Sequence, residues 1–288
     1  MYTLENDYLI IESKSSGAEL TRIYSKKYKK EILWDGDAKH WGRQSPVLFP
    51  IVGRLKNNET IIEDSLCKMG QHGFARDMNF ELLSTSQESI TYKLTSANVD
   101  KNIYPYDFEL YITYTLLCDK VNIKWEVKNT DSKEIYFSIG AHPAFNISSA
   151  DDLDKYSMGF KCRENVKHIS LVGPYHDKFK SVKSLNNLNL YPNIFENDAL
   201  IYTDIDEISL KNKESNLSIN VLIKDFPLVG VWTPYYKESN STAPFICIEP
   251  WYGLADGVDS NNIYKDKKYI NKLNISETFS ADYSIEIK

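Results

Sequence analysis

The sequence predicts an all-β fold, a sandwich or barrel of many short strands. Apolar and polar residues alternate along several segments, which is the period of a half-buried strand. Convincing helical periodicity is nearly absent from the chain. The composition includes 20 Tyr, 12 Phe and 5 Trp, and aromatic side chains suit the pleated surface of a sheet. Because an all-β domain can reach about 250 residues, we expect residues 1–288 to form one domain.

The expected strands are short and are separated by segments rich in turn-forming residues. In chain order they span residues 8–12, 18–24, 31–34, 80–84, 89–95, 108–118, 121–128, 135–139, 199–202, 217–222, 228–232, 245–249 and 279–288. The alternation is clearest over residues 89–95 and 279–288. The only helix that we expect is a short one over residues 261–273.

One β-hairpin is expected in the middle of the chain. Residues 108–118 are rich in Tyr, Ile and Thr, which are good strand formers. In residues 121–128 every second residue is apolar, so one face is expected to be buried. Only Asp119 and Lys120 separate these two segments, which is the spacing of a tight hairpin.

Charge and composition exclude several classes of function. The 34 Lys and Arg residues against 40 Asp and Glu residues give a net charge of −6, the wrong sign for general nucleic-acid binding. No apolar segment approaches the roughly 18 residues of a membrane span, and the N-terminal residues do not resemble a secretory signal. The four cysteines form no C-x-x-C pair, so we expect reduced thiols in a cytoplasmic protein. Nucleotide-binding and zinc-protease motifs are absent, so we expect no cofactor and no metal.

Two of the five histidines have surroundings typical of a functional site. His72 lies next to glycine, which allows close approach of the backbone. His142 follows the strand expected over residues 135–139 and precedes Pro143, which favours extended backbone and limits ladder pairing. A hydrogen-bonded structural role explains either histidine equally well. The other histidines are expected in loops or at the surface: His40, His168 and His176.

The third candidate is Glu249, at the end of the apolar strand expected over residues 245–249. Burying a carboxylate among apolar residues is costly unless the group is paired or functional. Both an ion pair with an arginine and action as a general base with a shifted pKa are compatible with the sequence.

Four motifs occur in order along the chain: SPVLFPIVGRL at residues 45–55, HGFAR at 72–76, AHPAFN at 141–146 and CIEPWYG at 247–253. Together they resemble the aldose 1-epimerase (galactose mutarotase) superfamily, and specifically its short bacterial branch found with lactose-utilisation operons. The resemblance implies a large antiparallel supersandwich with a sugar cleft over one concave sheet. It also implies acid–base opening of a hexose ring without a metal, a nucleotide or a covalent intermediate.

The resemblance implies a role for each matching residue. Glu249 matches the catalytic base and His142 the catalytic acid, while His72 matches a histidine that binds substrate and assists at the ring oxygen. Arg54 matches an arginine that contacts sugar hydroxyls, and Asp198 matches a substrate-binding aspartate more loosely. We expect Glu249 and His142 to face one cleft about a sugar ring apart, with His72 and Arg54 on its rim.

Two alternatives to a neutral hexose remain. The compact HGFAR segment is shared with the hexose-6-phosphate 1-epimerase branch, and arginine favours bidentate contacts to phosphate. Arg76 therefore supports a hexose phosphate, unless Arg76 or Arg43 pairs with a nearby carboxylate. A non-catalytic carbohydrate-binding or sensing protein on the same fold is the other alternative. Either a monomer or a homodimer is compatible with the sequence. Several aromatic residues near the motifs are candidates to line a sugar cleft: Phe74, Phe145, Trp232 and Trp251.

Overall fold

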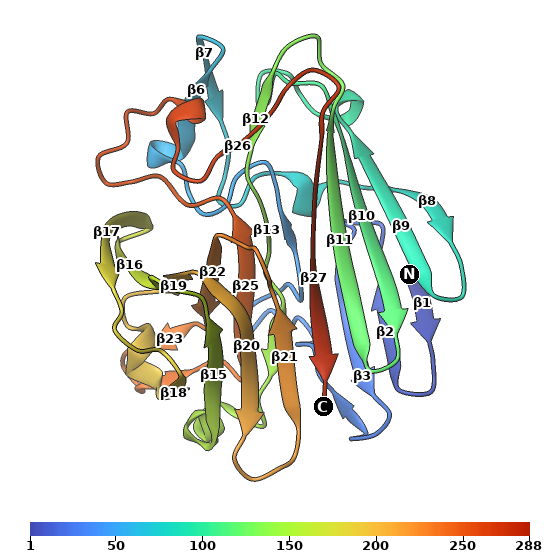
Figure 1. Ribbon diagram of the computed structural model, residues 1–288, viewed down its shortest axis with the longest axis vertical. Coiled ribbons are helices and arrows are strands. Elements are labelled where there is room, and N and C mark those ends of the chain that lie inside the picture. Colours follow the sequence, from blue (N-terminus) through green and yellow to red (C-terminus); the bar gives the residue numbers. More distant parts are fainter.

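The all-β prediction is confirmed. The computed structural model describes residues 1–288 and contains 27 strands and six short 3₁₀ helices, without an α-helix. The strands form large antiparallel sheets that face each other across a common core (Figure 1). None of the helices has the length and apolar character needed to cross a membrane.

The largest sheet has nine strands in the order β18-β15-β20-β21-β27-β11-β10-β9-β8. The C-terminal strand β27 runs between β11 and β21 near the middle of this sheet (Figure 1). Its strands are β8 (Glu81–Thr85), β9 (Ser89–Thr95), β10 (Phe108–Leu117), β11 (Lys120–Asn129), β15 (Tyr156–Cys162), β18 (Asn187–Asn189), β20 (Ile205–Asn212), β21 (Ser218–Leu222) and β27 (Thr278–Ile287).

The second sheet has eight strands in the order β17-β16-β19-β22-β25-β13-β5, with β14 also paired to β25. Strand β25 occupies a central place, between β22 on one side and β13 with β14 on the other. The strands are β5 (Val47–Leu48), β13 (Ile139–Ala141), β14 (Ala144–Asn146), β16 (Lys167–Val172), β17 (Tyr175–Ser181), β19 (Leu200–Thr203), β22 (Leu228–Trp232) and β25 (Phe245–Tyr252).

Smaller elements complete the fold. A four-stranded sheet contains β1 (Tyr2–Glu5), β2 (Leu9–Ser13), β3 (Leu20–Ser25) and β4 (Lys30–Glu31). Three further pairs are β6 (Glu59–Ile62) with β7 (Ser65–Lys68), β12 (Ile135–Phe137) with β26 (Asn271–Leu273), and β23 (Tyr235–Tyr236) with β24 (Ser241–Thr242). The 3₁₀ helices are η1 (Lys56–Asn58), η2 (Ala75–Asp77), η3 (Ser96–Asn98), η4 (Ala150–Lys155), η5 (Pro192–Phe195) and η6 (Tyr264–Asp266).

The predicted hairpin is confirmed as β10 and β11, which pair from Phe108 opposite Asn129 to Leu117 opposite Lys120. Buried and half-buried residues alternate along both strands, so one face enters a core of 63 buried residues. Burial of apolar area at about 25 cal/mol per Å² is the main force that stabilises such a core. Trp125 on this face is fully buried.

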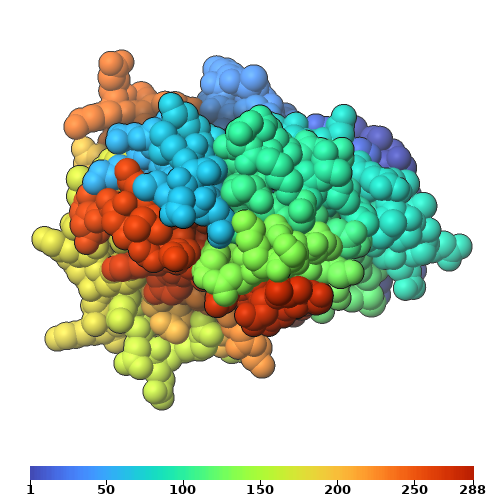
Figure 2. All heavy atoms as spheres, turned by 90° about the horizontal axis from the view of Figure 1, so that it is seen from above, coloured from blue at the N-terminus to red at the C-terminus, as the bar shows by residue number.

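The helix predicted over residues 261–273 is wrong. This segment holds only η6 and the short strand β26. Asn262 and Tyr269 have left-handed backbone, with φ of 61° and 59°, which a right-handed helix cannot accommodate. The segment is instead anchored by Tyr264, whose buried hydroxyl donates a hydrogen bond to the Pro50 carbonyl at 2.7 Å. It lies beside the β6–β7 hairpin at the end of the molecule seen in Figure 2, where Ile61 forms a parallel bridge with Ile263.

The sequence pattern also missed the strands β15 to β17. In β16 and β17 only one residue of each strand is buried and a register shift interrupts their pairing, so the alternation is weak there. His168 and His176 consequently lie in strands and not in loops. His176 is 4% exposed, so its expected place at the surface is wrong as well.

Candidate active site

A cavity of about 640 Å³ opens at the eight-stranded sheet. It has the size of a small-molecule site, and half of its lining is apolar with a few polar groups between. The residues that line it are Trp41, Val52, Gly53, Arg54, Gln71, His72, Arg76, His142, Leu171, Pro174, Asp198, Ala199, Ile201, Trp232, Glu249, Trp251, Leu254 and Ala255.

Glu249 reaches the cavity from the central strand β25. Neighbouring strands cover this strand on both sides, and seven of its eight residues are buried. The carboxylate is 1% exposed, and burial raises its pKa well above the ordinary value of 4.5. The nearby charge of Asp198 raises the pKa of Glu249 further, while the Trp251 indole acts in the opposite direction.

His142 lies between β13 and β14 and contacts Glu249 directly. Its Nε2 atom is 3.2 Å from Oε2 of Glu249. The Trp41 indole stacks on the imidazole, with ring centroids 4.7 Å apart and an interplanar angle of 28°. Burial lowers the pKa of His142 to about 3, and the charges of Arg76 and Arg43 act in the same direction.

This contact corrects the expected separation of Glu249 and His142 and excludes the ion pair of Glu249 with an arginine. Glu249 and His142 face one cavity, but they touch instead of lying a sugar ring apart. The partner of Glu249 is a histidine inside the cavity and not an arginine.

The backbone of Gly53 fixes the orientation of His72. The Gly53 amide donates a hydrogen bond to Nδ1 of His72 at 3.1 Å, and the His72 amide donates to the Gly53 carbonyl at 2.8 Å. Since Nδ1 accepts a hydrogen bond, the neutral ring carries its proton on Nε2. Burial and the charge of His142 lower the pKa of His72 well below 6.5, so this ring is a neutral donor. The rings of His72 and His142 lie 5.5 Å apart.

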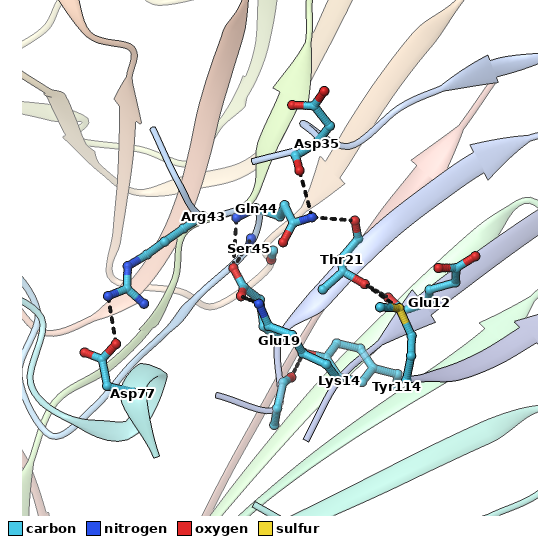
Figure 3. Close-up of polar contacts among 12 residues, drawn as sticks. Glu12, Lys14, Glu19, Thr21, Asp35, Arg43, Gln44, Ser45, Asp77 and Tyr114 are labelled. Carbon is cyan, nitrogen blue, oxygen red and sulfur yellow. Dashed lines mark hydrogen bonds and ion pairs between the residues drawn. The ribbon is translucent and has the colours of Figure 1, made fainter. Parts of the chain in front are cut away.

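Three arginines gather near His72 and differ in their partners. Arg43 pairs with Asp77 at 2.8 Å (Figure 3), as expected for a structural arginine. Arg76 donates to the Gln71 carbonyl at 2.7 Å, and its Nε forms no hydrogen bond but lies 3.8 Å from the carboxylate of Asp77. Burial, together with the charge of Arg43, lowers the pKa of Arg76 to about 10. Arg54 forms neither an ion pair nor a side-chain hydrogen bond, and it lines the cavity.

The loop that carries Trp41 and Arg43 is held by Glu19. The buried Glu19 carboxylate accepts hydrogen bonds from the backbone amides of Gln44 and Ser45 at 2.8 and 3.1 Å (Figure 3). Lys14 pairs with the same carboxylate at 2.6 Å. Charge-assisted hydrogen bonds of this kind are stronger than neutral ones, so they fix the loop against the sheet.

Trp251 forms one wall of the cavity because two neighbouring strands carry glycine. A Cβ atom at Gly140 would lie 2.6 Å from the Trp251 indole, and one at Gly230 would lie 2.4 Å from it. Trp232 lies at the end of β22 and packs edge-on against His142 at 5.6 Å. The two tryptophans predicted near the cleft therefore line the cavity.

A buried ion pair supports the loop that contains Arg54. Asp256 and Lys267 form a salt bridge, and their side chains are 2% and 3% exposed. The other carboxylate oxygen of Asp256 accepts from the Lys56 amide at 2.8 Å. The Asp256 amide donates to the Arg54 carbonyl at 2.9 Å. This pair therefore connects the segment after β25 to the loop that presents Gly53 and Arg54.

The structure brings most of the predicted site residues to one cavity. His72, Arg76, Asp198 and the other matched polar residues all line it. Asp198 has left-handed backbone with φ of 71° and lies at the mouth, where partial desolvation raises its pKa. Phe74 and Phe145 do not line the cavity. The Phe74 ring packs on Phe49 at 6.2 Å, and Phe145 is fully buried in the core.

Sequence reasoning missed Trp41 and Gln71. Trp41 lies in a loop without any periodicity, so no pattern indicated its direction. Its place beside His40, between Asp37 and Arg43 in a polar segment, was the one available signal. Gln71 adjoins His72 within a motif that was already recognised.

Comparison with known proteins identifies relatives that agree with one another. The family model for aldose 1-epimerase matches residues 1–263. Protein LacX (chromosomal) of Lactococcus lactis subsp. lactis is 30% identical over 299 aligned positions, covering 99% of this chain and 98% of LacX. A solved galactose mutarotase related enzyme from Lactobacillus acidophilus has a TM-score of 0.94 and 31% identity, covering 100% of this chain and 97% of that one. A galactose mutarotase-like protein from Lactobacillus casei has a TM-score of 0.93 and 26% identity, with 100% of both chains covered.

Proposed function

This chain belongs to the aldose 1-epimerase family, and we propose that it interconverts the α and β anomers of a hexose by acid–base ring opening. The observation that carries the proposal is the buried contact between His142 and Glu249, 3.2 Å apart at one wall of the cavity. In this proposal Glu249 is the base that takes the proton of the anomeric hydroxyl. His142 is the acid that gives a proton to the ring oxygen.

The short separation of the two groups suits this chemistry. The anomeric hydroxyl and the ring oxygen are both bonded to C1, so the atoms that lose and gain a proton are neighbours. A carboxylate and an imidazole in contact can therefore reach both oxygens from one side of the sugar. Groups placed a full ring apart would address opposite ends of the substrate.

The proton count of the pair also fits. Burial raises the pKa of Glu249 and lowers that of His142, which favours the neutral form of each group, and in this proposal the two groups share a single proton. Transfer of that proton across the 3.2 Å contact gives the carboxylate and imidazolium that ring opening needs. When the C1–O5 bond breaks, the proton of the hydroxyl passes to Glu249 and the proton of His142 passes to O5. After rotation about C1–C2, ring closure returns both protons.

Other residues position the sugar in this proposal. His72 presents its Nε2–H as a hydrogen-bond donor, because Gly53 occupies Nδ1. Trp251 and Trp41 offer aromatic faces on which the apolar side of a pyranose can pack. Arg54 and Asp198 contact sugar hydroxyls.

The test is an anomerisation assay on α-D-glucose and α-D-galactose by polarimetry or saturation-transfer NMR. We expect Glu249→Gln and His142→Ala to lower the rate by about 10²- to 10⁴-fold each. Glu238→Gln, an exposed and unpaired glutamate, is the matched control and should keep the wild-type rate. If the wild type is no faster than Glu249→Gln while sugar still binds, the protein is a carbohydrate-binding or sensing protein and not an epimerase.

A hexose 6-phosphate is the second candidate substrate. It is favoured by Arg54, which lines the cavity without a carboxylate partner, whereas Arg43 and Arg76 both pair with Asp77. The same assay with glucose 6-phosphate, with and without Arg76→Ala, separates the two substrates. A phosphate substrate predicts a rise in KM for the variant on glucose 6-phosphate, with the value for glucose nearly unchanged.

A further inference from the structure

Three side chains of metal-binding type meet at the base of the cavity: His142, Cys247 and Glu249. One ligand atom from each lies within 4.8 Å of the others, and all three residues are buried. Cys247 and Glu249 share one face of β25 because they are two residues apart. His142 reaches them from the connection between β13 and β14, where Ala144 pairs with Cys247. Cys247 itself does not line the cavity, and the proposed reaction leaves it without a role.

We propose that this cluster is a binding site for Zn²⁺ or a similar thiophilic divalent cation, and that the bound ion inhibits the enzyme. Thiolate, imidazole and carboxylate are the ligands that Zn²⁺ takes in proteins. Three protein ligands leave a fourth position, which here faces the cavity and is open to water or to a sugar hydroxyl.

The ligand distances come close to a tetrahedral site. Metal–ligand bonds of about 2.0 to 2.3 Å place neighbouring ligand atoms roughly 3.3 to 3.8 Å apart. The atoms Nε2 of His142 and Oε2 of Glu249 are already 3.2 Å apart. A separation of up to 4.8 Å within the cluster then requires the ligand atoms to approach one another by about 1 Å.

Charge balance favours the divalent ion. A thiolate and a carboxylate together cancel the charge of Zn²⁺, so the site with neutral His142 carries no net charge in its apolar surroundings. One ligand atom of the cluster, Oε2 of Glu249, has no hydrogen-bond partner in spite of its burial. Asp198 adds a negative charge nearby, whereas the charges of Arg76 and Arg43 oppose cation binding.

Inhibition follows because the ion occupies the lone pairs that the reaction uses. Binding releases the thiol proton of Cys247 and the proton held by the His142–Glu249 pair. Affinity should therefore increase as the pH rises. Metal binding itself does not depend on the proposed function, whereas the inhibition does.

Titration of the intact protein with Co²⁺ tests the site, because a thiolate bound to Co²⁺ produces a characteristic near-ultraviolet absorption band. Zn²⁺ should displace Co²⁺ and abolish the band. We expect Cys247→Ala and Cys247→Ser to remove the band and to weaken Zn²⁺ affinity by at least about 10-fold by calorimetry. Cys118→Ala, at an exposed cysteine, is the control and should retain both.

Inhibition is tested on enzyme that has been treated with a chelator to remove bound metal. Wild type should lose anomerisation activity on addition of Zn²⁺ but not of Mg²⁺, and both Cys247 variants should keep basal activity and resist Zn²⁺. Circular dichroism checks that they are folded, and the serine variant preserves the volume of the side chain. The absence of a thiolate band in the wild type, or unchanged affinity in both variants, would overturn the proposal. A band without any anomerisation activity would retain the metal site and reject the proposed function.

Discussion

Replacing Gly230 by alanine perturbs the packing that holds Trp251 in the cavity wall. The new Cβ atom would lie 2.4 Å from Cη2 and 2.6 Å from Cζ2 of the indole, whereas ordinary van der Waals contact begins at 3.4 Å. The indole must therefore shift by about 1 Å, or β22 must separate from β25. Gly140 already brings its own backbone close to the other part of the same ring, so little space remains for a shift within the sheet.

Overpacking of this kind costs about 1–3 kcal/mol of unfolding free energy. A displacement of about 1 Å in a wall that orients substrate lowers the rate by about 10²-fold. Urea unfolding and the anomerisation assay measure the two effects. Gly70→Ala is the matched control, because a Cβ at that position has no heavy atom within 4 Å.

A double variant tests whether Gly230 makes room for the Trp251 indole. Trp251→Phe removes the indole atoms that the new methyl group would meet, so Gly230→Ala should cost less in the Trp251→Phe background than in the wild type. Equal costs in the two backgrounds, or a Gly230→Ala protein as stable and as active as the wild type, would show that the glycine does not make room for Trp251.

Four further predictions follow, three from the buried ionisable groups and one from the hydrogen bond of His72. The pKa of His142 is lowered from 6.5 to about 3, so the unfolded chain binds its proton first. Stability should therefore fall by about 1.4 kcal/mol per pH unit as the pH drops from 6.5 to 3, and urea titrations should show a smaller loss for His142→Gln. The pKa of Glu249 is raised, so Glu249→Gln should be more stable than wild type above pH 4.5, a difference that disappears at lower pH. Lys267→Met should lower the free energy of unfolding by about 3–5 kcal/mol, because it leaves Asp256 buried and unpaired. Adding Asp256→Asn to this variant should restore part of that free energy, as measured by urea unfolding. His72→Asn should retain the fold, because the asparagine side-chain oxygen can accept the hydrogen bond from the Gly53 amide. Anomerisation should slow, because the shorter side chain no longer presents the Nε2–H donor of His72 to the cavity.

The central strands were predictable because their burial has a simple period. Strands β10 and β11 show uninterrupted alternation, and β25 shows a continuous apolar run. The expected end of this strand at Glu249 is wrong, because β25 continues through Pro250 to Tyr252. Strands β16 and β17, the last two at one end of the eight-stranded sheet, have few buried residues, so they lack the alternation of buried and exposed residues that would have indicated them. Over residues 261–273 the spacing of apolar residues resembled a helix, although contacts with distant segments, such as the bond from Tyr264 to Pro50, determine the conformation.

The sequence motifs predicted which polar residues meet but not how their neighbours point. His72 and Arg76 face the cavity, whereas Phe74 between them turns into the core against Phe49. The distance between His142 and Glu249 was mispredicted because motif spacing carries no information about side-chain separation. Trp41 was missed because its position depends on Glu19, which holds the following backbone from the connection between β2 and β3.

The stacking of Trp41 on His142 has a consequence for exchange with the solvent. In the proposed reaction, His142 and Glu249 begin and end each turnover in the same protonation state, so the pair takes no proton from water and returns none to it. The reacting groups then need no chain of water molecules to the surface, and the indole can shield the imidazole permanently without slowing the reaction. In the proposed reaction, this internal exchange of protons makes the rate insensitive to buffer concentration although the cavity is open to water.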